Sequence, residues 1–273
     1  MTDNRSRLID YNYLLNEQYK NANNLAARAQ IHIRFSTNKY GWQQWLFDQF
    51  DLPADARVVE FGTGPSWLWA ENLHRIPTEW AITLTDFSSG MIAESKQNLA
   101  HSGRPFKHDV VDVQSIPYAD ATFDAVIANH MLYHVPDIKK GISEMRRILK
   151  PTGKLFTATN GKNHLRELHE MQARFSPDLD YWQGFSAARS FELDNGRDTL
   201  LQFFPQVILN RYVDALVVTE AQPLIDYMLS GKAGATVSGP KLAELHQFVQ
   251  HEIDTQGAIH ITKDPGLLIS SLE

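Results

Sequence analysis

The sequence contains no cysteine, which excludes disulfide bonds and thiolate chemistry. A chain without cysteine fits a reducing compartment. The polar N-terminus, residues 1–7, has no apolar segment behind it and does not resemble a signal peptide. No apolar run reaches the roughly 18 residues that a membrane span needs. These absences together predict a cytoplasmic protein that does not cross a membrane.

The sequence also lacks a basic excess. It has 26 Lys and Arg residues against 32 Asp and Glu residues, which gives a formal net charge of −6. A nucleic-acid-binding protein usually carries a basic stripe. The basic pairs here, Lys139-Lys140 and Arg146-Arg147, fall on the expected solvated face of one helix. We therefore expect a small-molecule partner and no nucleic acid, and the sequence leaves monomer and homodimer open.

Strand-like and helix-like segments alternate between about residue 52 and residue 160. The expected strand at 124–128 is continuously apolar after its first residue, Asp124, as in a strand that is buried on both faces. Such alternation predicts an α/β fold with a doubly wound, mostly parallel sheet and helices on both faces. The expected strands are 57–61, 81–85, 106–113, 124–128 and 154–159, and the expected helices are 66–75, 88–100 and one that begins at Asp137.

The turn after the first expected strand has two of the three glycines of a dinucleotide-binding turn. In VVEFGTGPSWLW, residues 58–69, Gly62 and Gly64 would let a ligand approach the backbone. The third glycine, which admits a pyrophosphate and close helix packing, is missing. Asp86 ends the second strand at about the 20-residue distance where an acid can bind ribose hydroxyls. This pattern favours a ribonucleoside ligand without a diphosphate over a purely structural turn.

Four pieces of sequence together resemble the class I S-adenosylmethionine-dependent methyltransferases. They are VVEFGTGPSWLW, LTDFSSGMI, VVDVQSIPYADATFDAVIANHMLYHVPD and EMRRILKPTGKLF, and they follow the family's order over about residues 55–160. RFSTNKYGWQQW also resembles a bacterial small-molecule-type subgroup. Ser66 departs from the family's G-x-G-x-G turn, where a glycine is usual. The resemblance implies a seven-stranded Rossmann-like sheet, S-adenosyl-L-methionine as cofactor, S-adenosyl-L-homocysteine as product, and methyl transfer to a small molecule.

The resemblance also implies which residues bind the cofactor. Those matching the family's positions around the methionine and ribose are Glu60, Gly62, Thr63, Gly64 and Asp86. Those matching its adenine-binding and sulfonium-adjacent positions are Phe87, Asp112, Val113 and Asn129. Asp109 competes with Asp112 for the adenine, because HDVVDV allows a shift of register. Arg34 and Tyr40, with Trp42 nearby, are expected at the methionine end, where Arg34 could pair with the carboxylate.

The segment NHMLYHV, residues 129–135, follows the fourth strand and should lie near the transferred methyl group. Methyl transfer from a sulfonium needs alignment more than acid catalysis, because the leaving group departs neutral. A base is needed only for an acceptor that arrives protonated, and His134 with Tyr133 is the candidate for this role. The alternative is a structural His134. His130 and His134 have a metal-ligand spacing, but no acidic partner supports a metal site.

The rest of the chain is expected to complete and cover this fold. We predict an N-terminal helical cap over 1–50, a cofactor-binding half over 51–160, a lid insertion over 161–203 and completing strands and helices over 204–273. The lid is rich in aromatic residues, which suits a partly apolar acceptor. Residues 206–219 resemble the antiparallel strand pair that closes the family's sheet, and 258–270 could form a terminal hairpin. The lid aromatics are Tyr181, Trp182, Phe185 and Phe191.

Two other functions compete with methyl transfer. A nicotinamide-dependent oxidoreductase could use a similar sheet, but the missing third glycine argues against it. A regulatory protein could bind an S-adenosyl ligand without catalysis, and the sequence separates this poorly because methyl transfer requires no invariant catalytic side chain. The methylated atom of the acceptor, whether O, N, S or C, is also left open.

Overall fold

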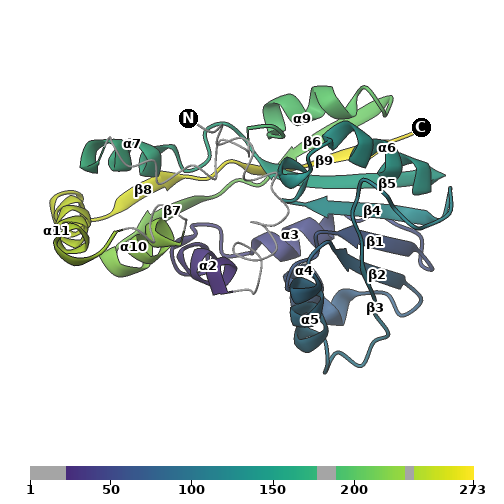
Figure 1. Cartoon of the computed structure of the whole chain (residues 1–273), viewed down its shortest axis with the longest axis horizontal. Coiled ribbons are helices and arrows are strands. Elements are labelled where there is room, and N and C mark those ends of the chain that lie inside the picture. The colour runs from purple at the N-terminus through teal and green to yellow at the C-terminus, as the bar shows by residue number, and fades with distance from the viewer. Residues whose placement is uncertain (1–22, 177–188, 231–236) are drawn as a thin grey trace.

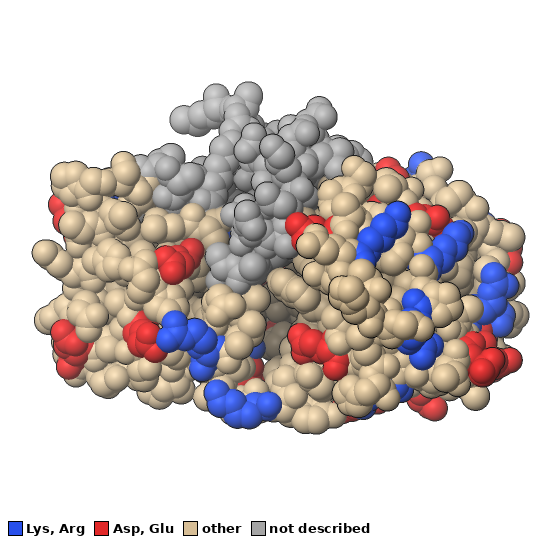
Figure 2. All heavy atoms as spheres, turned by 90° about the horizontal axis from the view of Figure 1, so that it is seen from below, with Lys and Arg blue, Asp and Glu red and all other residues tan. Residues whose placement is uncertain are grey.

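The computed structural model describes residues 23–176, 189–230 and 237–273. Figure 1 shows a large twisted sheet with helices on both faces, and a small two-stranded sheet that extends from one end of it. Within these ranges, no helix is long and apolar enough to cross a membrane. Figure 2 shows acidic and basic side chains interspersed on one face of the molecule, without a stripe of either sign. That face is also hollowed between the parts that surround the two sheets.

The large sheet has seven strands in the order β3-β2-β1-β4-β5-β9-β6. The first five strands along the chain pair in parallel, and β9 runs antiparallel to both β5 and β6. This confirms the predicted doubly wound, mostly parallel α/β sheet. The strands are β1 Arg57–Phe61, β2 Ala81–Asp86, β3 Lys107–Val110, β4 Phe123–Asn129, β5 Leu149–Asn160, β6 Gln206–Arg211 and β9 Pro265–Ser271.

Alternate side chains of the central strands face two separate layers of helices. Val59 and Val126 pack on one face with α6 Ile138–Ile148 and α9 Leu193–Leu200. Val58 and Ile127 pack on the other face with α3 Trp42–Asp48 and α4 Trp67–Glu71, which is followed by the short η3 Leu73–Arg75. Because both faces are covered, β1 and β4 each contain consecutive apolar residues, Val58 and Val59 in β1 and 125–128 in β4.

Two of the predicted helix starts are capped as expected. Ser88 Oγ accepts a hydrogen bond of 3.3 Å from the Met91 N–H at the start of α5 Ser89–Asn98. The Asp137 carboxylate accepts one of 3.0 Å from the Lys140 N–H at the start of α6. Each cap satisfies a backbone donor that has no partner inside its helix.

The small sheet has its own helices and its own core. It pairs β7 Ala215–Val218 antiparallel with β8 Ile259–Thr262. Its core contains the buried residues Leu168, Leu224, Leu245 and Ile261. Figure 1 shows β7 continuing from β6, and β8 continuing into β9. The helices around it are α2 Asn23–Phe35, α7 Arg166–Phe175, α10 Ala221–Leu229 and α11 Gly239–Gln256.

Two predicted strand pairs are wrong. The strand predicted at 206–212 pairs with β9 instead of with 215–219, and 258–270 forms two strands in different sheets instead of a hairpin. Each arm of the long β6–β9 hairpin is broken once, at 212–214 and at 263–264, and α10 and α11 are inserted at its tip. In the sequence these short polar breaks look like the tight turns of hairpins. In the structure the chain continues in the same direction through both of them.

Candidate functional site

The carboxyl ends of three neighbouring strands bring the predicted cofactor residues together. Phe61 at the end of β1 is in register with Thr85 of β2 and with Ala128 of β4. The next residues along these strands are therefore the glycine turn, Asp86 and Asn129. An open parallel sheet binds its ligands at this edge, where the strand order reverses.

The two glycines of the turn have different physical reasons to be glycine. Gly62 has φ +68°, and a Cβ there would lie 2.7 Å from the Met131 Cβ. Gly64 has φ +51°, and a Cβ there would meet no described atom within 4 Å. Packing therefore requires Gly62, whereas the open side of Gly64 gives a ligand access to the backbone.

Alanine substitutions should separate these two roles. Gly62→Ala is expected to lower the free energy of unfolding by roughly 2–4 kcal/mol, because it adds a clash to backbone strain. Gly64→Ala is expected to lower it by only about 1–2 kcal/mol, the strain of a left-handed residue. Urea unfolding measures both values. Equal losses would contradict the packing role of Gly62.

Ser66 adopts a backbone conformation that favours glycine. It has φ +60° in the left-handed region and is almost fully buried. Its hydroxyl lies 2.8 Å from Thr63 Oγ1 and 2.6 Å from Ser95 Oγ, which continues to His108 Nε2 at 2.9 Å. These buried hydrogen bonds offset the backbone strain. At this departure from the family's turn, the serine makes buried hydrogen bonds that a glycine could not make.

Glu60 is a buried acid behind the turn, only 3% exposed. Its carboxylate accepts hydrogen bonds from Thr63 Oγ1 at 2.8 Å, Trp69 Nε1 at 2.7 Å and Asn129 Nδ2 at 3.3 Å. Burial raises the pKa of Glu60 to about 7, although these bonds act in the opposite direction. The sequence analysis missed Trp69. The signal for it was its position on the helix after the turn, because a buried indole N–H needs an acceptor.

Glu60→Gln should reveal this raised pKa in a pH series. A carboxyl group whose pKa rises on folding stabilises the fold below its unfolded pKa, and this contribution is lost as pH rises through the folded value. For Glu60 the window runs from 4.5 to about 7. From pH 5 to pH 8, wild-type ligand-free protein should lose about 2–3 kcal/mol more stability than Glu60→Gln. Urea unfolding at both pH values measures this, and parallel curves would contradict it.

Asp86 ties the glycine turn to the start of α5. It is 5% exposed, and its carboxylate accepts from the Gly64 N–H at 3.0 Å and the Ser88 N–H at 2.9 Å. Burial raises the pKa of Asp86 to about 6. Phe87, which follows it, is partly exposed at the same edge. The carboxylate is therefore oriented by backbone donors at the strand end that the sequence assigned to the ribose.

The two candidate adenine-binding acids differ in their surroundings. Asp109 lies within β3, opposite Thr85, and its carboxylate accepts from Tyr118 Oη and Lys107 Nζ, both at 2.7 Å. Asp112 lies beyond the strand end, in the loop that the Val111 N–H joins to the Asp86 carbonyl at 3.0 Å. It accepts from the Gln114 N–H at 2.9 Å. The following Val113 is buried in the core.

The segment after β4 folds back over the glycine turn. Asn129 Oδ1 is buried and has no hydrogen-bond partner among the described residues. His130 has φ +53° and donates its backbone N–H to the Ala158 carbonyl at 2.8 Å. Met131 contacts Gly62, and Tyr133 and His134 lie in η4 Leu132–His134 with ring centroids 4.5 Å apart. The structure thus places both predicted catalytic residues one short turn beyond the strand end.

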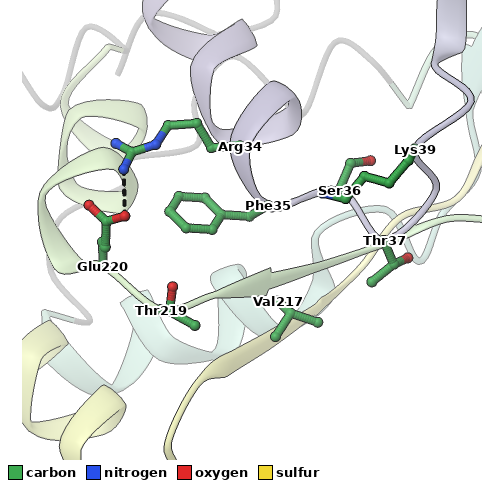
Figure 3. A pocket seen from close by; sticks show the side chains of 8 residues that line it. All are labelled: Arg34, Phe35, Ser36, Thr37, Lys39, Val217, Thr219 and Glu220. Carbon is green, nitrogen blue, oxygen red and sulfur yellow. Dashed lines mark hydrogen bonds and ion pairs between the residues drawn. The ribbon is translucent and has the colours of Figure 1, made fainter.

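The N-terminal residues assigned to the cofactor have other partners. Arg34 forms an ion pair with Glu220, and Figure 3 shows the two side chains facing each other beside Phe35. Tyr40 is 54% exposed and donates its hydroxyl to Asp48 at 2.6 Å. The ion pair lies in an open pocket of about 550 Å³ that contains no residue of the glycine turn. This pocket is lined by Arg34, Phe35, Ser36, Thr37, Lys39, Val217, Thr219 and Glu220.

Aromatic residues reach the end of β4 from the segment before the glycine turn, where Trp42 was expected near the methionine end. Trp42, at the start of α3, has its ring 5.6 Å from His130 and 5.4 Å from Tyr212. Phe191, one of the predicted lid aromatics, is instead buried in the core of the large sheet, where its carbonyl accepts from Thr159 Oγ1 at 2.8 Å. Tyr181, Trp182 and Phe185 lie outside the described residues.

Comparison with known proteins agrees with this geometry. The model of a methyltransferase domain matches residues 59–157, which run from β1 to β5. Residues 59–157 therefore form a class I S-adenosylmethionine-dependent methyltransferase domain. S-adenosylmethionine is the cofactor of this family, as the sequence resemblance implied.

Relatives of the methyltransferase domain match about half of the chain. The ubiquinone/menaquinone biosynthesis C-methyltransferase UbiE of Desulfotalea psychrophila is 31% identical over 141 residues, which cover 50% of this chain and 56% of that protein. A demethylmenaquinone methyltransferase of Desulfitobacterium hafniense is 28% identical over 138 residues, 48% of this chain and 53% of its own. The chain thus spans about half the length of these relatives.

Solved structures show the same fold over more of the chain. Phosphoethanolamine N-methyltransferase 2 of Haemonchus contortus, in complex with S-adenosyl-L-methionine, has a TM-score of 0.58 at 14% identity. The match covers 95% of this chain and 59% of that chain. The YcgJ protein of Bacillus subtilis has a TM-score of 0.55 at 14% identity, over 85% of this chain and 98% of its own. At these identities the likeness concerns the fold alone.

Proposed function

We propose that this protein transfers the methyl group of S-adenosylmethionine to a small-molecule acceptor. The main observation behind this proposal is that Glu60, Asp86 and Asn129 lie beside the glycine turn at one edge of the sheet. Hydrogen bonds join Asn129 to Glu60 and Gly64 to Asp86, inside the methyltransferase domain. The relatives' names include a C-methyltransferase and an N-methyltransferase, so they do not single out the methylated atom.

The side chains at this edge fit the proposed cofactor. The buried, unpaired Asn129 Oδ1 can accept a hydrogen bond from a ligand ammonium group, and the buried carboxyl of Glu60 lies beside it. Asp86 presents an oriented carboxylate to ribose hydroxyls, next to the open side of Gly64. We assign the adenine to Asp112 and Val113 with Phe87, because Asp109 already accepts from Tyr118 and Lys107.

The protein's part in the reaction is to hold two molecules in line and keep water out. The cofactor supplies an activated methyl group on a sulfonium. The segment after β4 closes over the turn through the contact of Met131 with Gly62, so the acceptor is expected on the side of Tyr133 and His134. Orientation of this kind accounts for about 7–11 kcal/mol of a barrier. His134 is proposed to take the proton of an acceptor that arrives protonated.

Ligand-induced stabilisation tests the proposal. S-adenosylmethionine and S-adenosylhomocysteine should each raise the melting temperature by several degrees, because a ligand stabilises the state that it binds. NAD, the matched control, should leave it unchanged. Binding of NAD without binding of either S-adenosyl ligand would contradict the proposal. Cell extract incubated with cofactor carrying an isotopically labelled methyl group would then identify the acceptor, and absence of any labelled product would favour a regulatory binding protein.

A further inference from the structure

Three histidines from distant parts of the sequence come together beyond the end of β4. They are His32 in α2, His130 directly after β4 and His164 just before α7, here called the histidine cluster. The rings of His32 and His164 stack with centroids 6.4 Å apart, and Tyr227 packs edge-on against His32 at 6.0 Å. His130 lies close enough to His32 and His164 for a positive charge on its ring to lower the pKa of both.

A buried ion pair faces this cluster. The side chains of Lys263 and Asp214 are 8% and 0% exposed and form an ion pair. Lys263 Nζ also donates to Ser36 Oγ at 3.3 Å and lies 5.9 Å from the centre of the Tyr212 ring. Asp214 accepts further hydrogen bonds from Ser36 Oγ and from the Asn38 N–H, and these bonds, after the stronger one from Lys263, lower its pKa to about 2 against the opposing effect of burial. Burial lowers the pKa of Lys263, whereas its hydrogen bond and ion pair with Asp214 act in the opposite direction and favour the charged lysine.

The histidines are neutral hydrogen-bonding groups in a positive potential. Burial, together with the charge of Lys263, lowers the pKa of His32 to about 3 and that of His130 to about 4, and at His32 the charge of Asp214 acts in the opposite direction. His164 Nδ1 accepts from the Asp264 N–H at 3.1 Å, so the proton of this imidazole is on Nε2 and can be donated. His32 Nδ1 is buried, with no hydrogen-bond partner in the described part of the chain. An anionic oxygen could accept from the His164 Nε2–H and from Lys263, and from His32 Nδ1 when that nitrogen carries the ring proton.

We infer that the histidine cluster and Lys263 form the polar end of the acceptor site and bind an anionic oxygen, either a carboxylate or an ionised phenol. This inference rests on the proposed methyl transfer, because His130 directly follows Asn129 at the expected position of the methyl group. Trp42, packed between His130 and Tyr212, supplies an adjoining apolar surface for a ring. Within the described ranges, no group of three His, Cys, Asp or Glu side chains has the arrangement of a metal site.

Paired probes test the inference on the full-length protein saturated with S-adenosylhomocysteine. Benzoate is compared with benzamide, and 4-nitrophenol at a pH where it is ionised with 4-nitroanisole, by titration calorimetry. At least one anion should bind ten or more times more tightly than its neutral counterpart, and the two pairs separate a carboxylate site from a phenolate site. Lys263→Met should reduce this preference by about 10–100-fold, as expected for a charge-assisted hydrogen bond. Lys241→Met, on the surface of α11, should leave it unchanged.

Two further variants keep the test decisive if Lys263→Met fails to fold. Lys263→Met combined with Asp214→Asn leaves no unpaired buried charge, and His32→Phe keeps the stacking on His164 but removes the ring nitrogens. Both should lose the preference for the anion. Binding of S-adenosylhomocysteine without any anion preference, or a preference that survives in both variants, would overturn the inference alone. Failure of S-adenosylhomocysteine itself to bind would overturn the proposed function and this inference together.

Discussion

Replacing Asp86 with alanine is expected to weaken the binding of S-adenosylhomocysteine by roughly 10²–10⁴-fold. The carboxylate is proposed to accept two charge-assisted hydrogen bonds from the ribose, each of about 1.5–3 kcal/mol. The structure adds a second reason for a large effect. The same carboxylate accepts from the Gly64 and Ser88 N–H groups, so alanine also loosens the turn that forms the site. Titration calorimetry measures the loss of affinity.

Neighbouring acids provide matched controls for this experiment. Asp109→Asn should bind S-adenosylhomocysteine like the wild type, because Asp109 is engaged with Lys107 and Tyr118 on β3. Asp112→Asn should bind it several-fold more weakly, in keeping with the adenine assignment. Circular dichroism checks that each variant is folded. An unchanged dissociation constant in folded Asp86→Ala would mean that the ribose binds elsewhere.

The alternating half of the fold could be predicted because its signals are local. Strands buried on both faces, such as β4, need continuous apolar runs, and capping residues such as Ser88 and Asp137 mark helix starts. Once strands and helices alternate, right-handed crossovers leave few possible arrangements of the sheet. Asp86 was singled out by its place at a strand end, whereas Glu60 and Asn129 were assigned through the family resemblance; the three lie at or next to the ends of neighbouring strands.

The C-terminal part was mispredicted because strand pairing is not local. β6 and β9 are the arms of one hairpin, yet more than fifty residues separate them in sequence and two helices lie between them. Short apolar runs carry no information about which distant run will be their partner. The breaks at 212–214 and 263–264 contain charged residues that in fact meet inside the protein, as Lys263 and Asp214.

The histidine cluster shows the same limit for a site. His32, His164 and Lys263 lie in three separate segments, and each looks like an ordinary polar residue in its own stretch of sequence. The histidine spacing noted in the sequence, His130 to His134, is a different pairing from the one in this cluster, where His130 lies near His32 and His164. Arg34 is a similar case, since its partner Glu220 lies 186 positions away. Such residues are identified only when the tertiary fold brings them together.

Replacing His134 with glutamine is expected to lower turnover strongly. A positioned general base contributes about 10²–10⁴-fold, and glutamine keeps hydrogen-bonding capacity but cannot take a proton near neutral pH. With the acceptor identified, kcat should therefore fall by about that factor, while the dissociation constant for S-adenosylhomocysteine stays unchanged. His251→Gln, on the exposed surface of α11, is the matched control and should keep full turnover. If His134 instead only stabilises the turn after β4, the variant will melt at a lower temperature and keep its turnover per folded molecule. That result would leave alignment by the protein as the whole catalytic contribution, with the methyltransferase assignment intact.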